Sequence, residues 1–219
     1  MIKERPILFS GAMVRAILEG RKAVTRRVVK PARLELLDAA ALAGECMPLG
    51  SDRQDWGYIA DLCPYGKPGD QLWVRETCFI NGPGKGSEVI YKSDPLPNWE
   101  GEETDIRWRP SIHMPRWASR IQLEITAVRV ERLQDGEGET AFESRYLAEG
   151  IHRIHHGDGD YYHHGAQSEP GPGNWGDPFD AWRELWQSIN GPESWNANPW
   201  VWVVEFRRIN HQQEQNNEN

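Results

Sequence analysis

The chain is poor in cysteine and has no long apolar segment. Its 219 residues include three cysteines, Cys46, Cys63 and Cys78, an odd number without a CxxC pair. This pattern argues against a disulfide framework or a zinc knuckle and favours a reducing compartment. No apolar run approaches the roughly 18 residues that a transmembrane helix needs, and the N-terminus has no apolar signal core. We therefore expect a soluble, cytoplasmic protein that does not bind a membrane.

The chain also lacks an overall positive charge. Its formal net charge is -8, so a nucleic-acid-binding function would require a local basic face on an acidic body. The length suits one domain with insertions and is sufficient for a proper core. The 11 tryptophans are numerous for this length. They can supply stacking platforms for bases, but packing is the better interpretation for most of them.

Signals for a nucleoside triphosphate, a metal or another cofactor are weak. The Gly-rich turn at residues 81–87 lacks the Lys-Ser/Thr ending of a phosphate loop. Five histidines invite a metal hypothesis: His152, His155, His156, His163 and His164. The Gly, Asp and Tyr residues around them favour a mobile surface loop instead. We expect no cofactor and no designed metal site.

Hydrophobic patterning predicts a mixture of strands and helices. Strands are expected at about 6–9, 71–77, 88–92, 119–134 and 199–206, and helices at about 11–19, 34–43, 141–148 and 177–189. In residues 119–134 the apolar residues move from odd positions, which end at Ala127, to even positions from Val128 on, which predicts a β-bulge near Ala127. The last strand is largely apolar and should be central. The fold class is therefore expected to be α+β.

Residues 19–27 concentrate ionisable and nucleophilic side chains. Lys22 and Thr25 are three positions apart and would share one side of a helix or tight turn. A desolvated lysine can serve as a base, and threonine becomes a nucleophile when a base lies nearby. The alternative is an ordinary helix C-terminus, with Gly20 near the cap and basic residues beside the negative end of the helix dipole.

A second unusual segment interleaves arginine and tryptophan. Residues 107–120 include Arg107, Trp108, Arg109, Arg116 and Trp117, and prolines keep the segment extended. Guanidinium groups for phosphate and indole rings for base stacking are typical of a single-strand contact. The alternative is a structural wall of tryptophan with arginine–acid pairs.

Glu76 is placed on the apolar face of the strand at residues 71–77. A carboxylate in such a position either forms an ion pair with a nearby arginine or belongs to a site. Both interpretations stay open from the sequence.

Three motifs carry a family resemblance. Gly-Arg-Lys-x-x-Thr at 20–25, Gly-Asp-x-Leu-Trp-Val-Arg-Glu at 69–76 and Ala-Glu-Gly at 148–150 occur in an order of elements that resembles the ASCH family of the PUA-like superfamily. The resemblance covers roughly residues 6–31, 66–80, 117–151 and 178–208. The longer form, with the segments 112–120 and 188–195, looks like ASCH proteins of bacteriophages and prophages.

This resemblance implies a PUA-like mixed β-barrel with helices at its mouth and a cleft that handles RNA or a modified nucleoside. It places a single domain at residues 1–209, with insertions at about 32–65, 81–116 and 152–177, followed by a disordered tail at 210–219. The insertions flank the implied cleft and would enlarge or cover it.

The resemblance also implies a catalytic set. Small bacterial ASCH proteins include amidohydrolases that remove the acetyl group from N4-acetylcytidine by means of a Lys, a Thr and a Glu. Matched by motif, these are Lys22, Thr25 and Glu149, with Glu76 in reserve for the Glu. In the implied mechanism, Lys22 takes the proton of Thr25, Thr25 attacks the amide carbonyl, and Glu149 carries the proton to the leaving amine.

The cations beside this set have implied roles too. Arg21 and Arg26 would help to lower the pKa of Lys22. Arg26 and Arg27 add positive charge beside Thr25, which suits a phosphate more than an uncharged nucleoside.

Other ASCH relatives are reported as ribonucleases or RNA binders, so fold alone does not determine chemistry. One alternative is a ribonuclease, and another is a non-catalytic reader of single-stranded RNA or modified bases, with single-stranded DNA as a further ligand. Phosphate would then be contacted by Arg26, Arg27, Arg75, Arg107, Arg109 and Arg116, and Trp108 or Trp117 would stack. A third alternative is a phage accessory protein that binds a host protein through a tryptophan-rich surface.

Overall fold

The computed structural model describes residues 2–50, 56–95, 106–135, 143–155, 157–164 and 174–209, with the backbone alone for residues 56, 57, 143 and 144. The predicted tail at 210–219, His156 and parts of the three predicted insertions lie outside the described residues. The expected α+β class is confirmed by a mixed sheet with helices packed on it.

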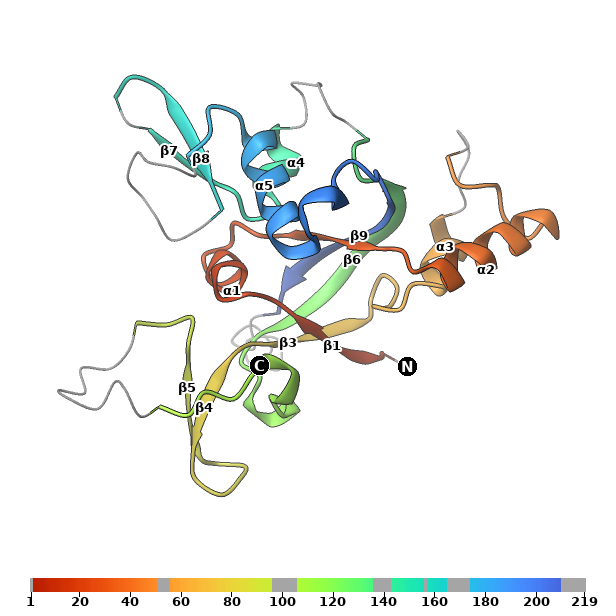
Figure 1. Cartoon of the computed structure of the whole chain (residues 1–219). Helices are drawn as coiled ribbons and strands as arrows, with labels where there is room; N and C mark the ends of the chain where they lie inside the picture. The colour runs from red at the N-terminus through yellow and green to blue at the C-terminus, as the bar shows by residue number, and fades with distance from the viewer. Residues whose placement is uncertain are drawn as a thin grey trace, which may run out of the picture.

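A five-stranded sheet forms the centre of the molecule (Figure 1). Its spatial order is β1 (Glu4–Leu8), β3 (Gln71–Arg75), β6 (Gln122–Arg132), β9 (Trp200–Arg208) and β2 (Val24–Val28). β1 pairs with β3 in parallel, and the other pairs are antiparallel. In the described part of the chain the sheet stays open, with β1 at one edge and β2 at the other.

The apolar last strand is central, as predicted. Its side chains alternate between two cores on opposite faces of the sheet: Trp202, Val204 and Phe206 enter the larger core, and Val201 and Val203 enter the smaller one. Because both faces of β9 are buried, neither face needs polar side chains. This explains why residues 200–204 of the strand are all apolar.

Helices cover each face. The larger core is closed by α1 (Gly11–Leu18), α2 (Pro31–Leu42) and α3 (Trp56–Asp61), and the smaller core by α4 (Glu143–Leu147) and α5 (Pro178–Asn190). α5 begins at Asp177, whose Oδ1 accepts a hydrogen bond from the Phe179 N–H at 2.7 Å, the N-cap that its sequence indicates. Its apolar stripe then packs against β9 and β2.

The predicted bulge in β6 is confirmed. The register of β6 against β9 shifts between Ile125 and Ala127. An extra residue on one strand reverses the alternation of its side chains, which is why the buried positions of β6 change from odd to even numbers there.

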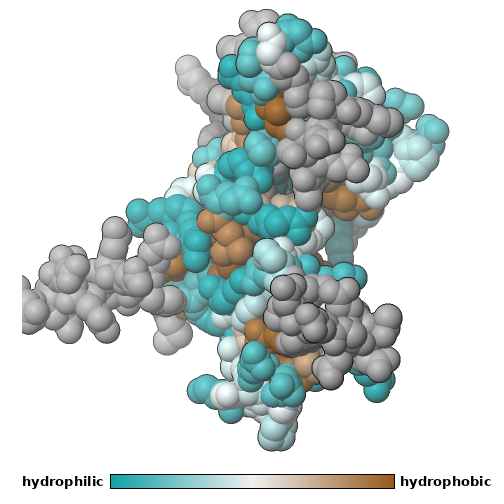
Figure 2. Space-filling view, turned by 90° about the vertical axis from the view of Figure 1, so that its left-hand side faces the viewer, coloured by the Kyte–Doolittle hydropathy of each residue, from teal (hydrophilic) through white to brown (hydrophobic). Residues whose placement is uncertain are grey.

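Two hairpins extend from the sheet (Figure 1). β4 (Cys78–Asn81) pairs with β5 (Glu88–Tyr91), and β7 (His152–His155) pairs with β8 (Asp160–His163). The prediction of a surface loop around the histidines is therefore wrong for the residues in β7 and β8. Figure 2 shows that the side of the molecule near both hairpins is largely hydrophilic, with apolar groups showing in a few places.

Asp70 connects the start of β3 to the segment of β1 by hydrogen bonds and an ion pair. Its carboxylate accepts hydrogen bonds from the backbone N–H groups of Lys3 at 3.0 Å and Lys67 at 3.3 Å, and Arg5 lies 3.5 Å away. Burial acts to raise the pKa of Asp70, but these N–H groups and the Arg5 charge together hold it below its ordinary value of 3.8.

We expect Asp70→Asn to destabilise the fold by about 1 kcal/mol at neutral pH. A depressed pKa in the folded state stabilises the protein above the unfolded-state pKa, and this contribution is lost as pH falls through the folded value. Urea unfolding at pH 7 and pH 3 should show a smaller acid-induced loss in Asp70→Asn than in the wild type. Asp61→Asn, an exposed carboxylate in the same region, serves as the control, and equal behaviour of the two variants would contradict the assignment.

Candidate functional site

The first helix ends near Gly20, as one of the two interpretations predicts, but Thr25 lies in a strand and not in a helix or tight turn. Ser10 caps α1, Gly20 follows it with a positive φ of 76°, and the chain enters strand β2 at Val24. Lys22 forms an isolated bridge with Glu149, just after α4. The Gly-Arg-Lys-x-x-Thr and Ala-Glu-Gly motifs therefore meet, although Lys22 and Glu149 are 127 residues apart.

The glycine of the second motif allows this close approach. Gly150 has a φ of 96°, and a Cβ at this position would lie 3.1 Å from the Ala16 Cβ and 3.4 Å from the Lys22 Cβ. A larger residue would be strained in this backbone conformation and would push α1 and Lys22 away.

Lys22, Glu149 and Arg26 form a buried ionic cluster. Lys22 Nζ lies 2.8 Å from Glu149 Oε2, and Arg26 Nη1 lies 2.8 Å from Glu149 Oε1. Arg26 also pairs with Glu131 at 2.9 Å, and its guanidinium lies 5.2 Å from the centre of the Trp182 ring. All three clustered side chains are at most 5% exposed, so each charge depends on its partners.

The hydrogen bonds of Lys22 leave it no free proton. Besides Glu149 Oε2, Nζ donates to the Glu149 carbonyl at 2.7 Å and to the Val24 carbonyl at 2.8 Å. An ammonium group has three donors and no acceptor. Within the described residues, no hydrogen bond joins Lys22 to Thr25, so the predicted Lys22–Thr25 pair is not formed in this structure.

Electrostatics favour an ionised Glu149. Burial acts to raise the pKa of Glu149, but Lys22 and Arg26 outweigh burial and hold it below the ordinary value. Burial lowers the pKa of Lys22, against the opposing effect of Glu149. Because Lys22 is surrounded by three oxygen acceptors, we describe the pair as ammonium and carboxylate. An ionised Glu149 can accept a proton but has none to give.

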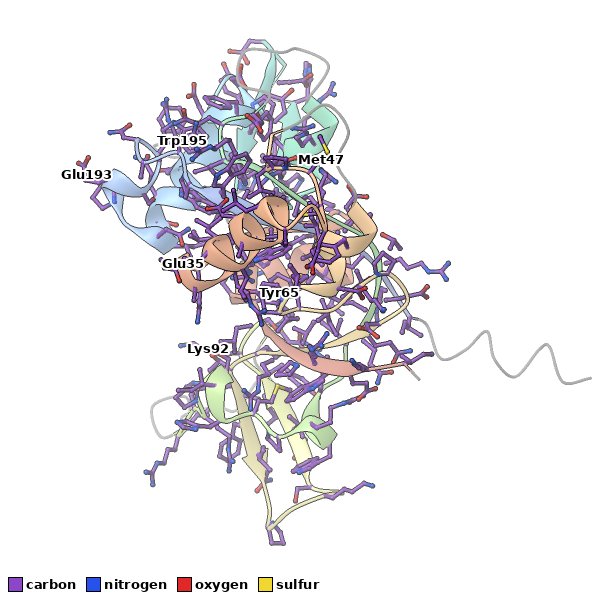
Figure 3. All side chains as sticks on the ribbon, turned by 90° about the vertical axis from the view of Figure 1, so that its right-hand side faces the viewer. Glu35, Met47, Tyr65, Lys92, Glu193 and Trp195 are labelled. Atoms are coloured by element: carbon purple, nitrogen blue, oxygen red, sulfur yellow. The ribbon has the colours of Figure 1, made fainter. Side chains whose placement is uncertain are left out.

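A pocket of about 120 Å³ lies beside this cluster, and we call it the Thr25 pocket. Residues 25–28 of β2 form one wall. Five residues of α5 form the facing wall: Trp182, Leu185, Trp186, Ile189 and Asn190. Met13, Tyr65 and Glu149 complete the lining; Tyr65 lies in the middle of the molecule in Figure 3. Thr25 and Glu149 thus line one pocket, whereas Lys22 lies behind Glu149 and is not part of the lining.

The β2 wall presents an unpaired strand edge. The bonds from Val29 N to the Trp200 carbonyl and from Phe206 N to the Ala23 carbonyl show that odd-numbered residues face β9. The N–H and C=O groups of Arg26 and Val28 therefore face away from β9, and no described residue pairs with them. An edge of this kind can exchange hydrogen bonds with a ligand.

Arg27 enters the same pocket without a counter-charge. Its Nη2 donates to the Leu8 carbonyl at 2.7 Å, and its guanidinium lies 5.3 Å from the centre of the Phe9 ring. Its Nε is buried without a hydrogen-bond partner, and no carboxylate of a described residue pairs with it. Burial lowers the pKa of Arg27, although Tyr65 and Glu149 act in the opposite direction.

The other predicted contact residues lie elsewhere. Arg21 is held by Glu19 and by the Gly150 carbonyl, at 3.0 Å, and so supports the loop instead of lining the pocket. Arg116 pairs with Glu4 at 2.9 Å. Arg75 lies 5.0 Å from the centre of the Trp73 ring, which also faces Arg116.

The arginine–tryptophan segment packs mainly as a structural unit. Trp117 packs on a small cluster of Cys78, Met114 and Ala118. Trp108 has Lys92 at 5.9 Å from its ring centre. Arg107 and Arg109 are exposed, and none of the predicted contact residues in this segment lines the Thr25 pocket.

Glu76 belongs to an ion-pair network, one of the two interpretations that its position allows. Arg120 Nε lies 2.9 Å from Glu76 Oε1, and Arg120 also pairs with Asp94 at 2.7 Å. The Ser93 hydroxyl donates to Glu76 Oε2 at 2.6 Å, and Tyr91 lies under the Arg120 guanidinium at 3.8 Å. This network joins β3 to the β4–β5 hairpin, and Glu76 does not line the Thr25 pocket.

Packing accounts for the tryptophans whose side chains are described. Four are buried (Trp182, Trp186, Trp195 and Trp202), and five are partly buried (Trp73, Trp108, Trp117, Trp175 and Trp200). None of these nine is fully exposed, so a tryptophan-rich docking surface is not seen in the part of the chain that the structure covers.

Sequence reasoning missed the facing wall of the pocket. Trp182 and Trp186 are visible in the sequence as the apolar stripe of a helix, which predicts core packing and gives no hint of a pocket. Tyr65 comes from a turn in one of the predicted insertions, and nothing in its sequence context indicates the site.

The described residues contain neither a metal-binding cluster nor a membrane-spanning helix. No cluster of three or more His, Cys, Asp or Glu side chains is arranged to hold a metal ion. No described helix is both long enough and apolar enough to cross a membrane.

Comparison with protein-family models, with curated proteins and with solved structures finds no match to this chain.

Proposed function

We propose that the Thr25 pocket binds a single nucleobase and that the protein hydrolyses an acyl group carried by that base, as in an N4-acylated cytidine. The observation that carries the proposal is the composition of the pocket. An unpaired strand edge, a threonine hydroxyl and an ionised carboxylate face two tryptophans and a tyrosine across a small cavity. Aromatic walls suit a flat base, and backbone N–H and C=O groups suit its polar edge.

In our proposal the catalytic roles differ from those that the family resemblance implies. Glu149 lines the pocket as a carboxylate, and each of its oxygens has one neighbouring donor and a further lone pair. Glu149 therefore takes the proton of Thr25, Thr25 Oγ adds to the acyl carbonyl, and the C–N bond breaks as Glu149 returns the proton to the amine. Water then hydrolyses the acyl-threonine ester.

Lys22 and Arg26 act as positioning residues in this mechanism. They keep Glu149 ionised and fix its orientation, and neither needs to give up a proton. The free N–H groups at the β2 edge supply donors for the oxyanion that forms on the acyl carbonyl.

A second candidate is a binding-only role. It is favoured by one observation: both oxygens of Glu149 are already engaged by Lys22 and Arg26. A carboxylate held in this way can serve recognition alone, and the protein would then read a modified base in single-stranded RNA.

The test compares two substitutions of one residue. Thr25→Ser keeps the hydroxyl, and Thr25→Val removes it without touching the ionic cluster. We expect the wild type and Thr25→Ser to release cytidine from N4-acetylcytidine, and Thr25→Val to be at least about 100-fold slower, measured by liquid chromatography.

The outcomes separate the two candidates. Binding of N4-acetylcytidine, or of RNA that contains it, without release of acetate would leave the binding-only role. Neither binding nor release, with the nucleoside or the RNA, would overturn the proposed function. Cleavage of RNA in the same incubations would point to a ribonuclease.

Kinship with ASCH domains and a PUA-like barrel are part of this proposal. The contact between the Gly-Arg-Lys-x-x-Thr and Ala-Glu-Gly motifs supports it, because two segments matched independently by resemblance form one cluster. The mixed sheet, with β2 and α5 as the walls of the pocket and Met13 of α1 in its lining, is compatible with a barrel mouth.

A further inference from the structure

The positive charges around the Thr25 pocket are not balanced. Lys22 and Arg26 are neutralised by Glu149 and Glu131 at 2.8–2.9 Å. Arg27 is the third cation at this place, and none of the carboxylates that the structure describes pairs with it. The pocket with its supporting cluster therefore carries one uncompensated positive charge.

This charge is held in a fixed orientation. The Phe9 ring covers the Arg27 guanidinium at 5.3 Å, and the Leu8 carbonyl takes the proton of Nη2. Nη1 is accessible and makes no hydrogen bond to a described residue, while Nε is buried without a partner. Leaving a buried N–H unpaired and a guanidinium half-buried without an anion is costly, unless a ligand supplies the missing acceptor.

We infer that the ligand of the Thr25 pocket carries a phosphate group and that Arg27 binds it. This inference rests on the proposed nucleobase site and names its substrate class as a nucleotide in place of an uncharged nucleoside. A planar guanidinium with open donors fits phosphate oxygens. The phosphate belongs either to a free mononucleotide or to an RNA strand, and the test distinguishes these sources.

The experiment measures binding by calorimetry to five probes: cytidine, N4-acetylcytidine, the 5′-monophosphate of each, and a short single-stranded RNA with the same bases. For the wild type we expect each monophosphate to bind about tenfold more tightly than its nucleoside. Arg27→Gln should abolish this difference and leave nucleoside affinity within about twofold. Lys30→Gln, which removes an exposed cation three residues away, should behave as the wild type.

A measurement without ligand supports the same assignment. Because no carboxylate of a described residue pairs with Arg27, Arg27→Gln leaves no buried anion without a partner, so its urea midpoint should fall only slightly, by the loss of the Leu8 and Phe9 contacts. A loss of several kcal/mol, as expected when a buried ion pair is broken, would indicate a structural counter-charge for Arg27 and would overturn the inference.

The possible results distinguish failure of this inference from failure of the proposed function. Equal affinity of nucleosides and monophosphates, or a phosphate preference that survives Arg27→Gln, overturns the inference while the nucleobase site stands. No binding of any probe overturns both. A preference for the mononucleotide over the RNA identifies a free nucleotide, and the reverse identifies a strand.

Discussion

Glu149→Gln is expected to destabilise the protein by about 3–5 kcal/mol. The substitution keeps the shape of the side chain but removes the charge that neutralises Lys22 and Arg26, which are 0% and 2% exposed. Breaking a buried ion pair from one side leaves its partners charged and desolvated, and this is the origin of the large cost. Urea unfolding at neutral pH measures it.

Two further variants test that explanation. Glu124→Gln removes a carboxylate from an exposed pair with Arg207 and should cost less than about 1 kcal/mol. Lys22→Met combined with Glu149→Gln should lose less stability than the sum of the two single variants, because the lysine charge is no longer stranded. A Glu149→Gln variant as stable as Glu124→Gln would show that the cluster is solvated.

Trp182→Ala should also lower the free energy of unfolding by about 3–5 kcal/mol, because it removes packing contacts. Trp182 is 3% exposed, and its ring lies 5.4 Å from the rings of both Tyr146 and Trp195. It also stacks under the Arg26 guanidinium. The substitution therefore removes the centre of the smaller core, one wall of the Thr25 pocket and a partner of the ionic cluster.

Thermal unfolding provides the measurement for Trp182→Ala. For a chain of this size, the expected loss corresponds to a fall in Tm of about 10 °C. Trp108→Ala makes the same chemical change at a partly buried position and should shift Tm only slightly. If both variants melt alike, Trp182 does not organise the core, and the α5 wall of the pocket needs another explanation.

Strongly periodic segments were predictable. The bulge at Ala127 follows from a shift in apolar parity, the central place of β9 follows from its continuous apolar run, and the start of α5 follows from Asp177 and Pro178. In each case a local sequence pattern indicates the conformation or the burial of the element. Such patterns are independent of what lies elsewhere in the chain.

Strand β2 and the β7–β8 hairpin were not predictable in this way. In Val24–Val28 two arginines interrupt the alternation, because Arg26 is buried only through acids that come from distant segments. The strands of the β7–β8 hairpin are rich in histidine and tyrosine, so polarity hides their pairing. Tertiary partners decide these elements, and a single sequence does not display them.

The candidate site was likewise predictable only in part. The resemblance named Lys22, Thr25 and Glu149, and the structure brings Lys22 to Glu149 and places Thr25 beside the latter in one pocket. The sequence could not show that all three Lys22 protons are engaged in hydrogen bonds, or that no carboxylate of a described residue pairs with Arg27. Both facts depend on distances between atoms that only the folded chain fixes.

The position of β9 has a consequence for biosynthesis. β2 is made early in translation, yet its one partner in the sheet is β9, which leaves the ribosome last among the described elements. β6 likewise gains its second neighbour only at that moment. Until residues 200–208 emerge, β2 has no strand to pair with among the described elements, and β6 has an unpaired edge. Completion of the sheet and of the pocket therefore waits for β9, and chaperone dependence is expected to rise when synthesis stops before this strand.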